Sequence, residues 1–170
     1  MVRFARTAVP ALLSVAVGAA LVSAVPAAAA PGAVVPGAAG APTCAAEDLG
    51  VSVGTPDVGA GQLYVPLVFT NVGGGPCTLL GYPGVSVLDA DLRRIGNPAE
   101  RDGRTAEPVR LAPGARATAV LHTTNGPIGG PCLPEGTHLS VYAPASTEAT
   151  VVDAAFRICS NRFTVGPVTA

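Results

Sequence analysis

The chain has 170 residues, of which 49% are hydrophobic, 12% charged and 4% aromatic, and its formal net charge is −1. All ten basic residues are arginines scattered along the chain; without Arg3 and Arg6, eight of them face eleven acidic residues, a net charge of −3. Nucleic-acid binding requires a concentrated basic face, so this composition argues against a nucleic-acid partner.

Residues 1–30 are predicted to be a secretory signal peptide. Arg3 and Arg6 supply a positive start, residues 11–25 form an apolar run, and "PAAAA" offers a small-residue cleavage site. The apolar run is shorter than the roughly 20 residues that a membrane-spanning helix needs, although an uncleaved anchor is the alternative. We therefore expect a secreted, extracellular protein with no membrane span after signal cleavage.

The rest of the chain divides into a linker and one domain. Residues 31–43, "PGAVVPGAAGAPT", contain too few bulky side chains to bury a face, which is typical of a flexible or partly extended spacer. Residues 44–168 have the length of one domain and suffice for a hydrophobic core.

The segment "QLYVPLVFT", residues 62–70, has the alternation of a strand. Leu63, Val65, Leu67 and Phe69 share one face, which we expect to point into the core. Pro66 lies on the other face and has no N–H, so we expect this strand at a sheet edge or with a bulge.

Further strand patterns follow at short intervals. They are "GVSVLD", "RATAVLHTT", "THLSVYAP", "EATVVDA" and "NRFTVGPV", with an exposed loop at 99–106, and about eight strands are expected in all. No helix is predicted that could connect parallel strands, so the connections should be antiparallel. The fold class is therefore all-β, an Ig-like antiparallel β-sandwich with a Greek key, although the Trp of true Ig domains is absent.

Four cysteines lie in the exported part: Cys44, Cys77, Cys132 and Cys159. An even number in a secreted domain indicates two disulfides. The sequence does not decide between the three pairings; we favour the sequential one, Cys44–Cys77 and Cys132–Cys159. A zinc site needs closely spaced cysteine pairs, and none is present in the sequence.

Several motifs together have the order seen in a known family. "FTN", three glycines, "PCTLLGYPGVSV", "LAPGARATAVL" and two later cysteines resemble the actinobacterial secreted domain-of-unknown-function family 4232. The resemblance extends over residues 44–168 and implies an Ig-like β-sandwich with two disulfides and no assigned activity. By position it implies framework roles for three of the cysteines, Cys77, Cys132 and Cys159, and for Asn71, Gly81, Tyr82, Pro83, Gly84, Pro113 and Gly114.

The framework interpretation has a physical basis in the corner at residues 71–84. Asn71 ends a strand, where its side chain can cap backbone groups of a turn. Gly73–Gly75 permit a positive φ. Gly81–Gly84 redirect the chain, and Tyr82 can bury its ring while its hydroxyl bonds a backbone carbonyl.

The polar residues do not form a recognisable catalytic or metal site. His122 and His138 are the only histidines, and both are interpreted as solvated strand residues. Asp89 and Asp91 lack the further ligands of a calcium loop, so a hairpin turn is favoured. No nucleophile elbow is present in the sequence.

The function expected from these observations is therefore binding rather than catalysis. We predict a monomeric, non-enzymatic module without cofactors or metal, whose partner is a protein or a cell-envelope component. The alternative is a small exported metal-binding protein or an enzyme whose site is not recognisable from the sequence.

Overall fold

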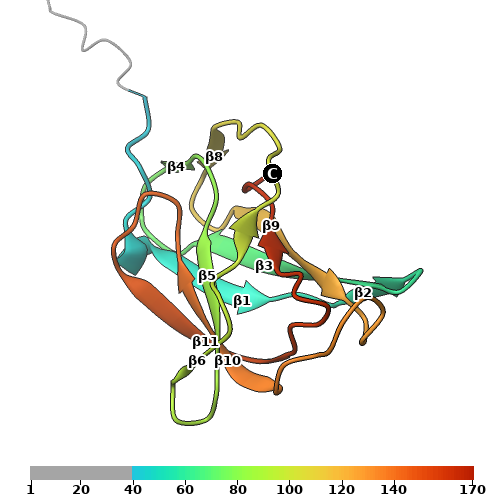
Figure 1. Ribbon diagram of the computed structural model, residues 1–170. Helices are drawn as coiled ribbons and strands as arrows, with labels where there is room; N and C mark the ends of the chain where they lie inside the picture. Colours follow the sequence, from blue (N-terminus) through green and yellow to red (C-terminus); the bar gives the residue numbers. More distant parts are fainter. Residues whose placement is uncertain (1–39) are drawn as a thin grey trace, which may run out of the picture. The chain divides into compact units, whose positions relative to one another are not determined.

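The computed structural model describes residues 40–170 (Figure 1). The predicted signal peptide and most of the predicted linker therefore lie outside the described residues. The last linker residues are held by Thr78: its N–H donates to the Pro42 carbonyl at 2.7 Å, and its hydroxyl donates to the Ala41 carbonyl at 3.3 Å. The ordered domain thus includes the chain just before Cys44.

Residues 40–170 consist of one 3₁₀ turn, Ala46–Asp48, and twelve strands. The strands are β1 Leu49–Val53, β2 Asp57–Gly59, β3 Gln62–Asn71, β4 Cys77–Leu79, β5 Gly84–Leu88, β6 Arg94–Ile95, β7 Glu100–Arg101, β8 Val109–Leu111, β9 Arg116–Thr124, β10 Gly136–Tyr142, β11 Ala149–Phe156 and β12 Thr164–Val165. This is more than the eight or so expected, because half of the strands have two or three residues, too few to show alternation. This part of the chain holds no helix with the length and hydrophobicity of a membrane span.

The strands form three sheets (Figure 1). The largest has the order β1-β3-β9-β12-β7, with β2 also paired to β3; the second has the order β11-β10-β5-β6, and β4 pairs with β8. The strand pairs are antiparallel, as predicted, except for the two-residue parallel pair of β12 and β7.

The hydrophobic core consists of side chains from both larger sheets in one cluster. Leu67 and Phe69 of β3, Val87 of β5, Leu121 of β9 and Leu139 of β10 are all fully buried. The two sheets therefore pack face to face, and the predicted antiparallel β-sandwich with two disulfides is confirmed.

The position of Pro66 differs from the prediction. Strand β3 is not at an edge, since it pairs with β9 on one side and with β1 and β2 on the other. The pairing on the side of β1 and β2 is interrupted beside Pro66. Val53 of β1 pairs with Leu67 and Asp57 of β2 pairs with Tyr64, so the connection between β1 and β2 has one residue more than the stretch of β3 opposite it. Pro66 faces this break, where only its carbonyl is used, by the N–H of Gly54 at 2.8 Å.

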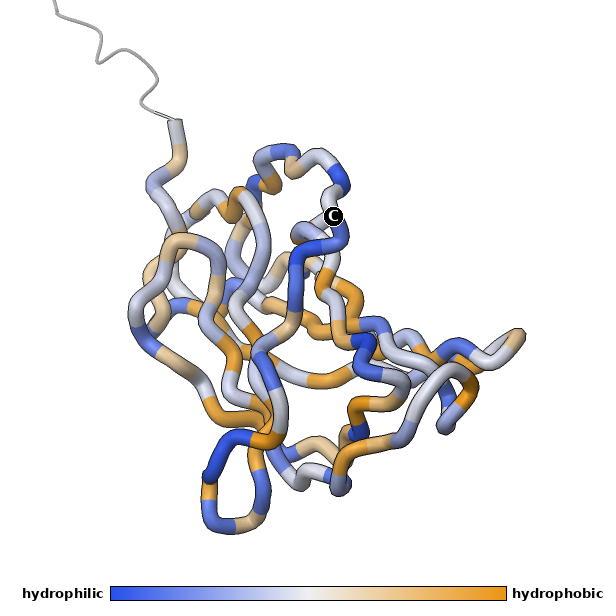
Figure 2. Tube along the Cα trace, in the orientation of Figure 1, coloured by the Kyte–Doolittle hydropathy of each residue, from blue (hydrophilic) through white to orange (hydrophobic). Residues whose placement is uncertain are grey.

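The predicted turn at Asp89 is confirmed. The Asp89 carboxylate accepts the N–H groups of Asp91 at 2.9 Å and Arg93 at 2.8 Å, and Leu92 has a left-handed φ of 60°. This loop joins β5 to β6, and it is largely hydrophilic at the bottom of Figure 2. The aspartates therefore stabilise a hairpin.

Candidate binding groove

Asn71 lies buried at the end of β3, where it holds three segments together. Its side-chain N–H groups donate to the carbonyls of Gly75 at 2.9 Å and Leu111 at 3.0 Å, and its side-chain oxygen accepts the N–H of Gly73 at 2.9 Å. Only 1% of the residue is exposed. Because its polar groups are bonded inside the protein, Asn71 is a structural residue.

The triple glycine serves a different purpose from the one expected. None of Gly73, Gly74 and Gly75 is among the described glycines with a left-handed φ. A side chain at Gly73 would instead meet the Asp48 carboxylate, whose Oδ1 lies 2.6 Å from the Cβ position. Close approach of the 3₁₀ turn, rather than backbone conformation, therefore restricts Gly73.

The segment Gly81–Gly84 forms a corner that is hydrogen-bonded to the C-terminal segment of the chain. Gly81 has a φ of 112°, and its carbonyl accepts the N–H of Val168 at 2.9 Å. Pro83 is buried, whereas Gly84 is exposed and adjoins Tyr142.

Tyr82 reaches from this corner to the loop that follows β7. Its ring packs against the core, and its hydroxyl donates to the Arg104 carbonyl. The Arg101 guanidinium lies 5.4 Å from the ring centroid. Loss of water around the hydroxyl, and then the Asp102 carboxylate, raise the pKa of Tyr82 above its ordinary value. Tyr82 thus fixes residues 101–104 in place.

Pro113 and Gly114 form the tight turn before β9. Gly114 has a φ of 79°, and its N–H donates to the Asn71 carbonyl at 2.8 Å. The turn is therefore bonded to the same corner that Asn71 occupies.

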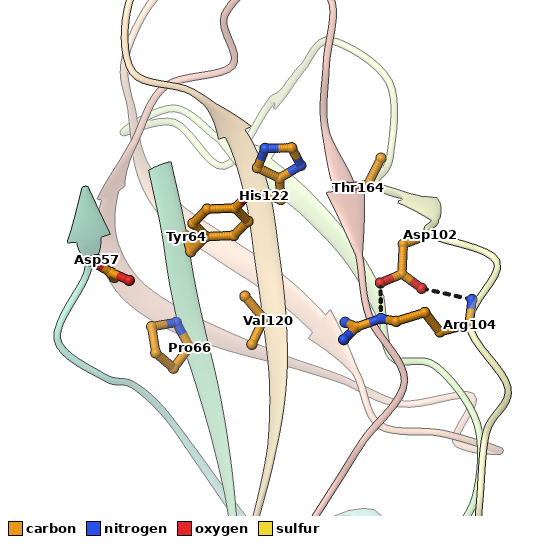
Figure 3. Close-up of a pocket in the computed structure, with 8 residues that line it drawn as sticks. All are labelled: Asp57, Tyr64, Pro66, Asp102, Arg104, Val120, His122 and Thr164. Atoms are coloured by element: carbon orange, nitrogen blue, oxygen red, sulfur yellow. Dashed lines mark hydrogen bonds and ion pairs between the residues drawn. The ribbon is translucent and has the colours of Figure 1, made fainter. Parts of the chain in front are cut away.

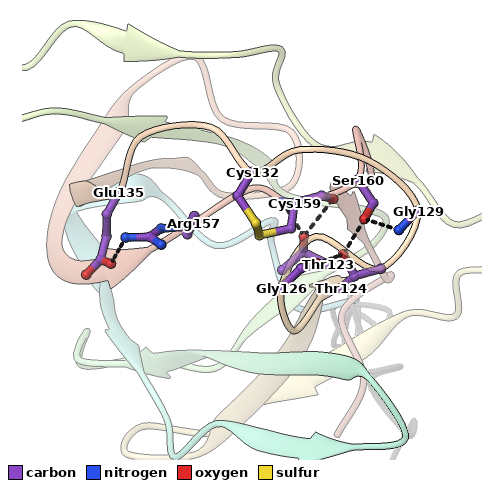
Figure 4. Close-up of a disulfide and its surroundings, with 9 residues drawn as sticks. All are labelled: Thr123, Thr124, Gly126, Gly129, Cys132, Glu135, Arg157, Cys159 and Ser160. Atoms are coloured by element: carbon purple, nitrogen blue, oxygen red, sulfur yellow. Dashed lines mark hydrogen bonds and ion pairs between the residues drawn. A yellow bond between two sulfur atoms is a disulfide. The ribbon is translucent and has the colours of Figure 1, made fainter.

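The four cysteines form two disulfides, Cys44–Cys77 and Cys132–Cys159, which is the sequential pairing. The first is buried in the core cluster with Leu79 and Leu111. The second joins two loops at the other end of β3 (Figure 4). Each therefore stabilises a different end of the sandwich.

A hydrogen-bond network surrounds the second disulfide (Figure 4). The Thr123 hydroxyl accepts the N–H of Cys159 at 3.1 Å, and the Thr124 hydroxyl lies 2.9 Å from the Ser160 hydroxyl. The Ser160 hydroxyl in turn accepts the N–H of Gly129 at 3.1 Å. The hydroxyl groups of both threonines are hydrogen-bonded within these loops, so their role is structural.

His122 and His138 lie on different sheets, on β9 and β10. His138 lies 3.2 Å from the Asp153 carboxylate of the neighbouring strand. Among residues 40–170, no three His, Cys, Asp or Glu side chains are grouped as metal ligands would be. The structure therefore does not bring the two histidines together.

A groove of about 490 Å³ lies on the outer face of the six-stranded sheet (Figure 3). It is lined by Asp57, Tyr64, Pro66, Asp102, Arg104, Val120, His122 and Thr164. These side chains come from β2, β3, β9, β12 and the loop after β7. Alternation places Tyr64, Pro66, Val120 and His122 outward, since their neighbours along β3 and β9 point into the core.

Arg104 is the positively charged residue of this groove, and its side chain is paired with Asp102. Its Nε donates to the Asp102 carboxylate at 2.5 Å, and its backbone N–H donates to the same side chain at 3.1 Å. The guanidinium lies close to Gly166 and reaches towards Val120 in Figure 3. Its two terminal nitrogens make no hydrogen bond within residues 40–170, so they can bind an acceptor from outside.

Tyr64 and His122 form a stacked pair at the far end of the groove. Their ring centroids are 4.6 Å apart with an interplanar angle of 12°, and Nε2 of His122 lies 2.7 Å from the Gln62 side-chain oxygen. Burial, and then the Arg162 guanidinium, lower the pKa of His122 below its ordinary value. His122 is therefore half-buried and neutral near pH 7, and less solvated than the sequence suggested.

The groove contains the parts of a binding surface. An apolar floor of Pro66 and Val120 lies between a stacked aromatic pair and an oriented guanidinium–carboxylate pair. Aromatic residues and arginine are the types enriched in the centres of protein interfaces. No serine, cysteine or threonine in the groove bonds to His122, so its hydrogen bonds match no nucleophile–base pair.

Sequence reasoning did not identify this groove. The outward alternation on β3 and β9 is visible in the sequence and would have paired Tyr64 with His122 once the strand register was known. Arg104 and Asp102 come from a distant loop that is hydrogen-bonded to Tyr82 and β12. No local pattern predicts that contact.

The chain thus combines a disulfide-linked β-sandwich with a shallow groove on one outer face. A family model described as "Domain of unknown function (DUF4232)" matches residues 44–169. The chain belongs to this family, as the sequence resemblance predicted.

The other comparisons add little. No curated protein matches the chain. Two solved structures of β-glucosidase from Kluyveromyces marxianus, one selenomethionine-labelled and one with glucose, are 13% and 12% identical with TM-scores of 0.35 and 0.37. Each match covers 69% of this chain but only 14% and 15% of the enzyme. Such a remote likeness says nothing about activity.

Proposed function

We propose that this chain is a secreted or cell-envelope, non-catalytic module that binds a protein or another envelope component through the groove. Two disulfides are compatible with an extracellular location, where thiols are oxidised. The signal peptide predicted at residues 1–30 supports the same compartment.

The observation that carries the proposal is the state of Arg104. Asp102 fixes its Nε at 2.5 Å, while its terminal nitrogens face the apolar floor of Pro66 and Val120 without an internal acceptor. The Arg104 side chain is 61% exposed, so these nitrogens are accessible to a partner. A pre-oriented guanidinium beside apolar surface is suited to a carbonyl or carboxylate of a partner.

The stacked pair favours a protein partner over a flat sugar ring. One face of Tyr64 is covered by His122 on β9, and Asp57 of β2 is opposite Tyr64 in the strand pairing. Carbohydrate stacking uses an open aromatic face, and His122 already occupies one of the two faces of Tyr64. Its exposed edge remains free for contacts with side chains.

Site-specific photo-crosslinking tests the proposal. A photoreactive amino acid replaces Val120 in the groove and, as the matched control, Ser86 on the outer face of the other sheet. On intact cells that export the protein, the position-120 variant should give a discrete adduct, and the position-86 variant should not. Arg104→Ala should remove the adduct without changing the urea midpoint of unfolding. Equal adducts from both positions, or an adduct insensitive to Arg104→Ala, would refute the groove as the binding site.

A further inference from the structure

Strand β11, Ala149–Phe156, forms an open edge of the four-stranded sheet. It pairs with β10 on one side, and no backbone group of residues 40–170 hydrogen-bonds its other side. Successive residues of a strand direct their N–H and C=O groups alternately to the two neighbours. Half of the peptide groups of β11 therefore lack a protein partner.

This edge differs from the other strand edges of the described chain. Strands β6 and β7 have two residues each and carry Arg94, Glu100 and Arg101, and β1 has five residues, whereas β11 has eight. Proteins usually protect a long edge with charged side chains, proline or a bulge. β11 has neither lysine nor proline, and its bulge lies at the end, between the pairs Gly136–Phe156 and His138–Asp153. Residues 149–153 therefore present a regular edge in which Asp153 is the charged side chain.

Hydrophobic side chains beside this edge are incompletely covered. Val51 and Val53 of β1 and Val152 and Ala154 of β11 pack against the core but remain partly exposed. Strand β1 lies against β11 on this side of the sandwich. On the outer face, Val151 is 49% exposed. An added strand would cover these side chains as it pairs with the free backbone groups.

We propose that β11 binds an extended, basic segment of a partner protein as an additional antiparallel or parallel strand. Glu148 just before β11 and Asp153 within it are both exposed, and the Asp153 carboxylate lies 3.2 Å from His138. The nearest arginine along the chain, Arg157, is already paired with Glu135 at 2.8 Å. The local charge therefore favours lysine or arginine in the partner segment.

The same charge argues against a second copy of this chain as the occupant. Pairing of β11 with another β11 would place two copies of Glu148 and Asp153, four carboxylates, along one short strand pair. Like charges across adjacent strands are destabilising. The acidic edge thus disfavours self-pairing while it selects a basic partner.

Amide hydrogen exchange with a defined peptide tests the proposal on the isotope-labelled exported protein. The probe is a blocked peptide, equal in length to β11, that alternates lysine with valine and threonine. At about ten times its Kd, alternate amides of residues 149–153 should exchange roughly tenfold more slowly, as mass action requires. The amides already bonded to β10 exchange slowly without peptide, so the distinctive result is new protection at the alternate amides that have no bond to β10. Unchanged fast exchange of these amides at saturating peptide would overturn strand addition.

Charge-reversed peptides and variants test the chemical class of the partner. A peptide with glutamate in place of lysine should bind about tenfold more weakly to the native protein, and Glu148→Lys with Asp153→Lys should invert this preference. The matched control, Asp91→Lys with Glu107→Lys, alters the net charge equally at exposed positions elsewhere and should leave the preference unchanged. An equal effect of the control pair, or concentration-dependent dimers of the native chain, would contradict the proposal. Arg104→Ala should have no effect, which separates this edge from the groove.

Discussion

The two ends of strand β3 differ in whether the polar side chains beside them are hydrogen-bonded within the protein. At one end, Asn71 is 1% exposed and bonds Gly73, Gly75 and Leu111 within the protein. At the other end, Tyr64 and Pro66 face a groove in which the terminal nitrogens of Arg104 have no internal partner. One strand therefore contributes both a closed structural corner and an open surface.

The difference explains why the recognisable motifs of this chain do not reveal its function. The motif residues lie where the chain turns sharply and where buried polar groups must be bonded, so their chemistry is determined by the fold. The groove depends on residues from separate strands and a loop, whose chemistry the fold leaves open. We therefore expect substitutions in the corner to change stability and substitutions in the groove to change binding.

The largest effect should come from the disulfide of the corner. Replacing Cys44 and Cys77 by alanine should lower the free energy of unfolding by roughly 4 kcal/mol, from loss of the crosslink and of buried sulfur. Both cysteines are at most 6% exposed. Urea unfolding of the purified variant measures the loss.

The matched comparison is Cys132→Ala with Cys159→Ala. Its loop is similar, 27 residues of sequence separation against 33, so the entropic part should be nearly equal. Cys132 is only half-buried, and the total loss should be smaller, about 3 kcal/mol. A larger loss at this second disulfide would reverse the ranking of the two ends.

Asn71→Ala should have the next largest effect. It leaves the buried Leu111 carbonyl, the Gly75 carbonyl and the Gly73 N–H without their partner, and unfolding should become about 3 kcal/mol easier. The matched control, Asn97→Ala, removes an exposed side chain without a hydrogen bond to residues 40–170 and should cost less than about 0.5 kcal/mol. Equal urea midpoints for the two variants would show that the corner is not the structural centre we infer.

The sequence predicts the long elements of the fold because they alternate. Leu67 and Phe69 of β3, and Ala119 and Leu121 of β9, point into the core as expected. The two-residue strands β6, β7 and β12 are invisible in the sequence, since pairing with neighbours rather than side-chain pattern defines them. The predicted edge position of the strand that contains Pro66 was wrong. The missing N–H of proline is accommodated by an interruption between the neighbouring strands β1 and β2, which the sequence of β3 does not show.

The candidate site was less predictable than the fold. His122 could be placed on the outer face, but its stacking on Tyr64 follows from the register of β3 and β9. The Arg104 contact requires a loop held through Tyr82, and the interpretation of residues 99–106 as a mere exposed loop gave no hint of it. The local pattern of hydrophobic residues does not predict long-range contacts of this kind.

Gly166→Ala distinguishes the groove from the corner most directly. A Cβ at this position would collide with the Arg104 guanidinium and displace it, yet the displaced group is the flexible end of an exposed side chain. The cost in stability should therefore be below about 0.5 kcal/mol. The photo-crosslink from position 120 should nevertheless be lost.

Gly59→Ala is a suitable control for this variant, because its added methyl group meets no atom within 4 Å. It should leave both the urea midpoint and the crosslink unchanged. If Gly166→Ala were as destabilising as Asn71→Ala, Arg104 would belong to the structural framework and not to an open surface.

The smallest effect should be a pH dependence at the groove. Burial and then Arg162 lower the pKa of His122, whereas in the unfolded chain this side chain takes up a proton near pH 6.5. Between these two values the unfolded chain binds the additional proton, so acidification from about pH 7 should lower the stability of the native protein. His122→Phe keeps an aromatic ring beside Tyr64 but removes the titrating group, and its stability should fall less over the same range. NMR titration of the His122 ring gives the midpoint directly; a midpoint at the ordinary value, with equal acid sensitivity of the two proteins, would mean that the groove is more open to water than its geometry indicates.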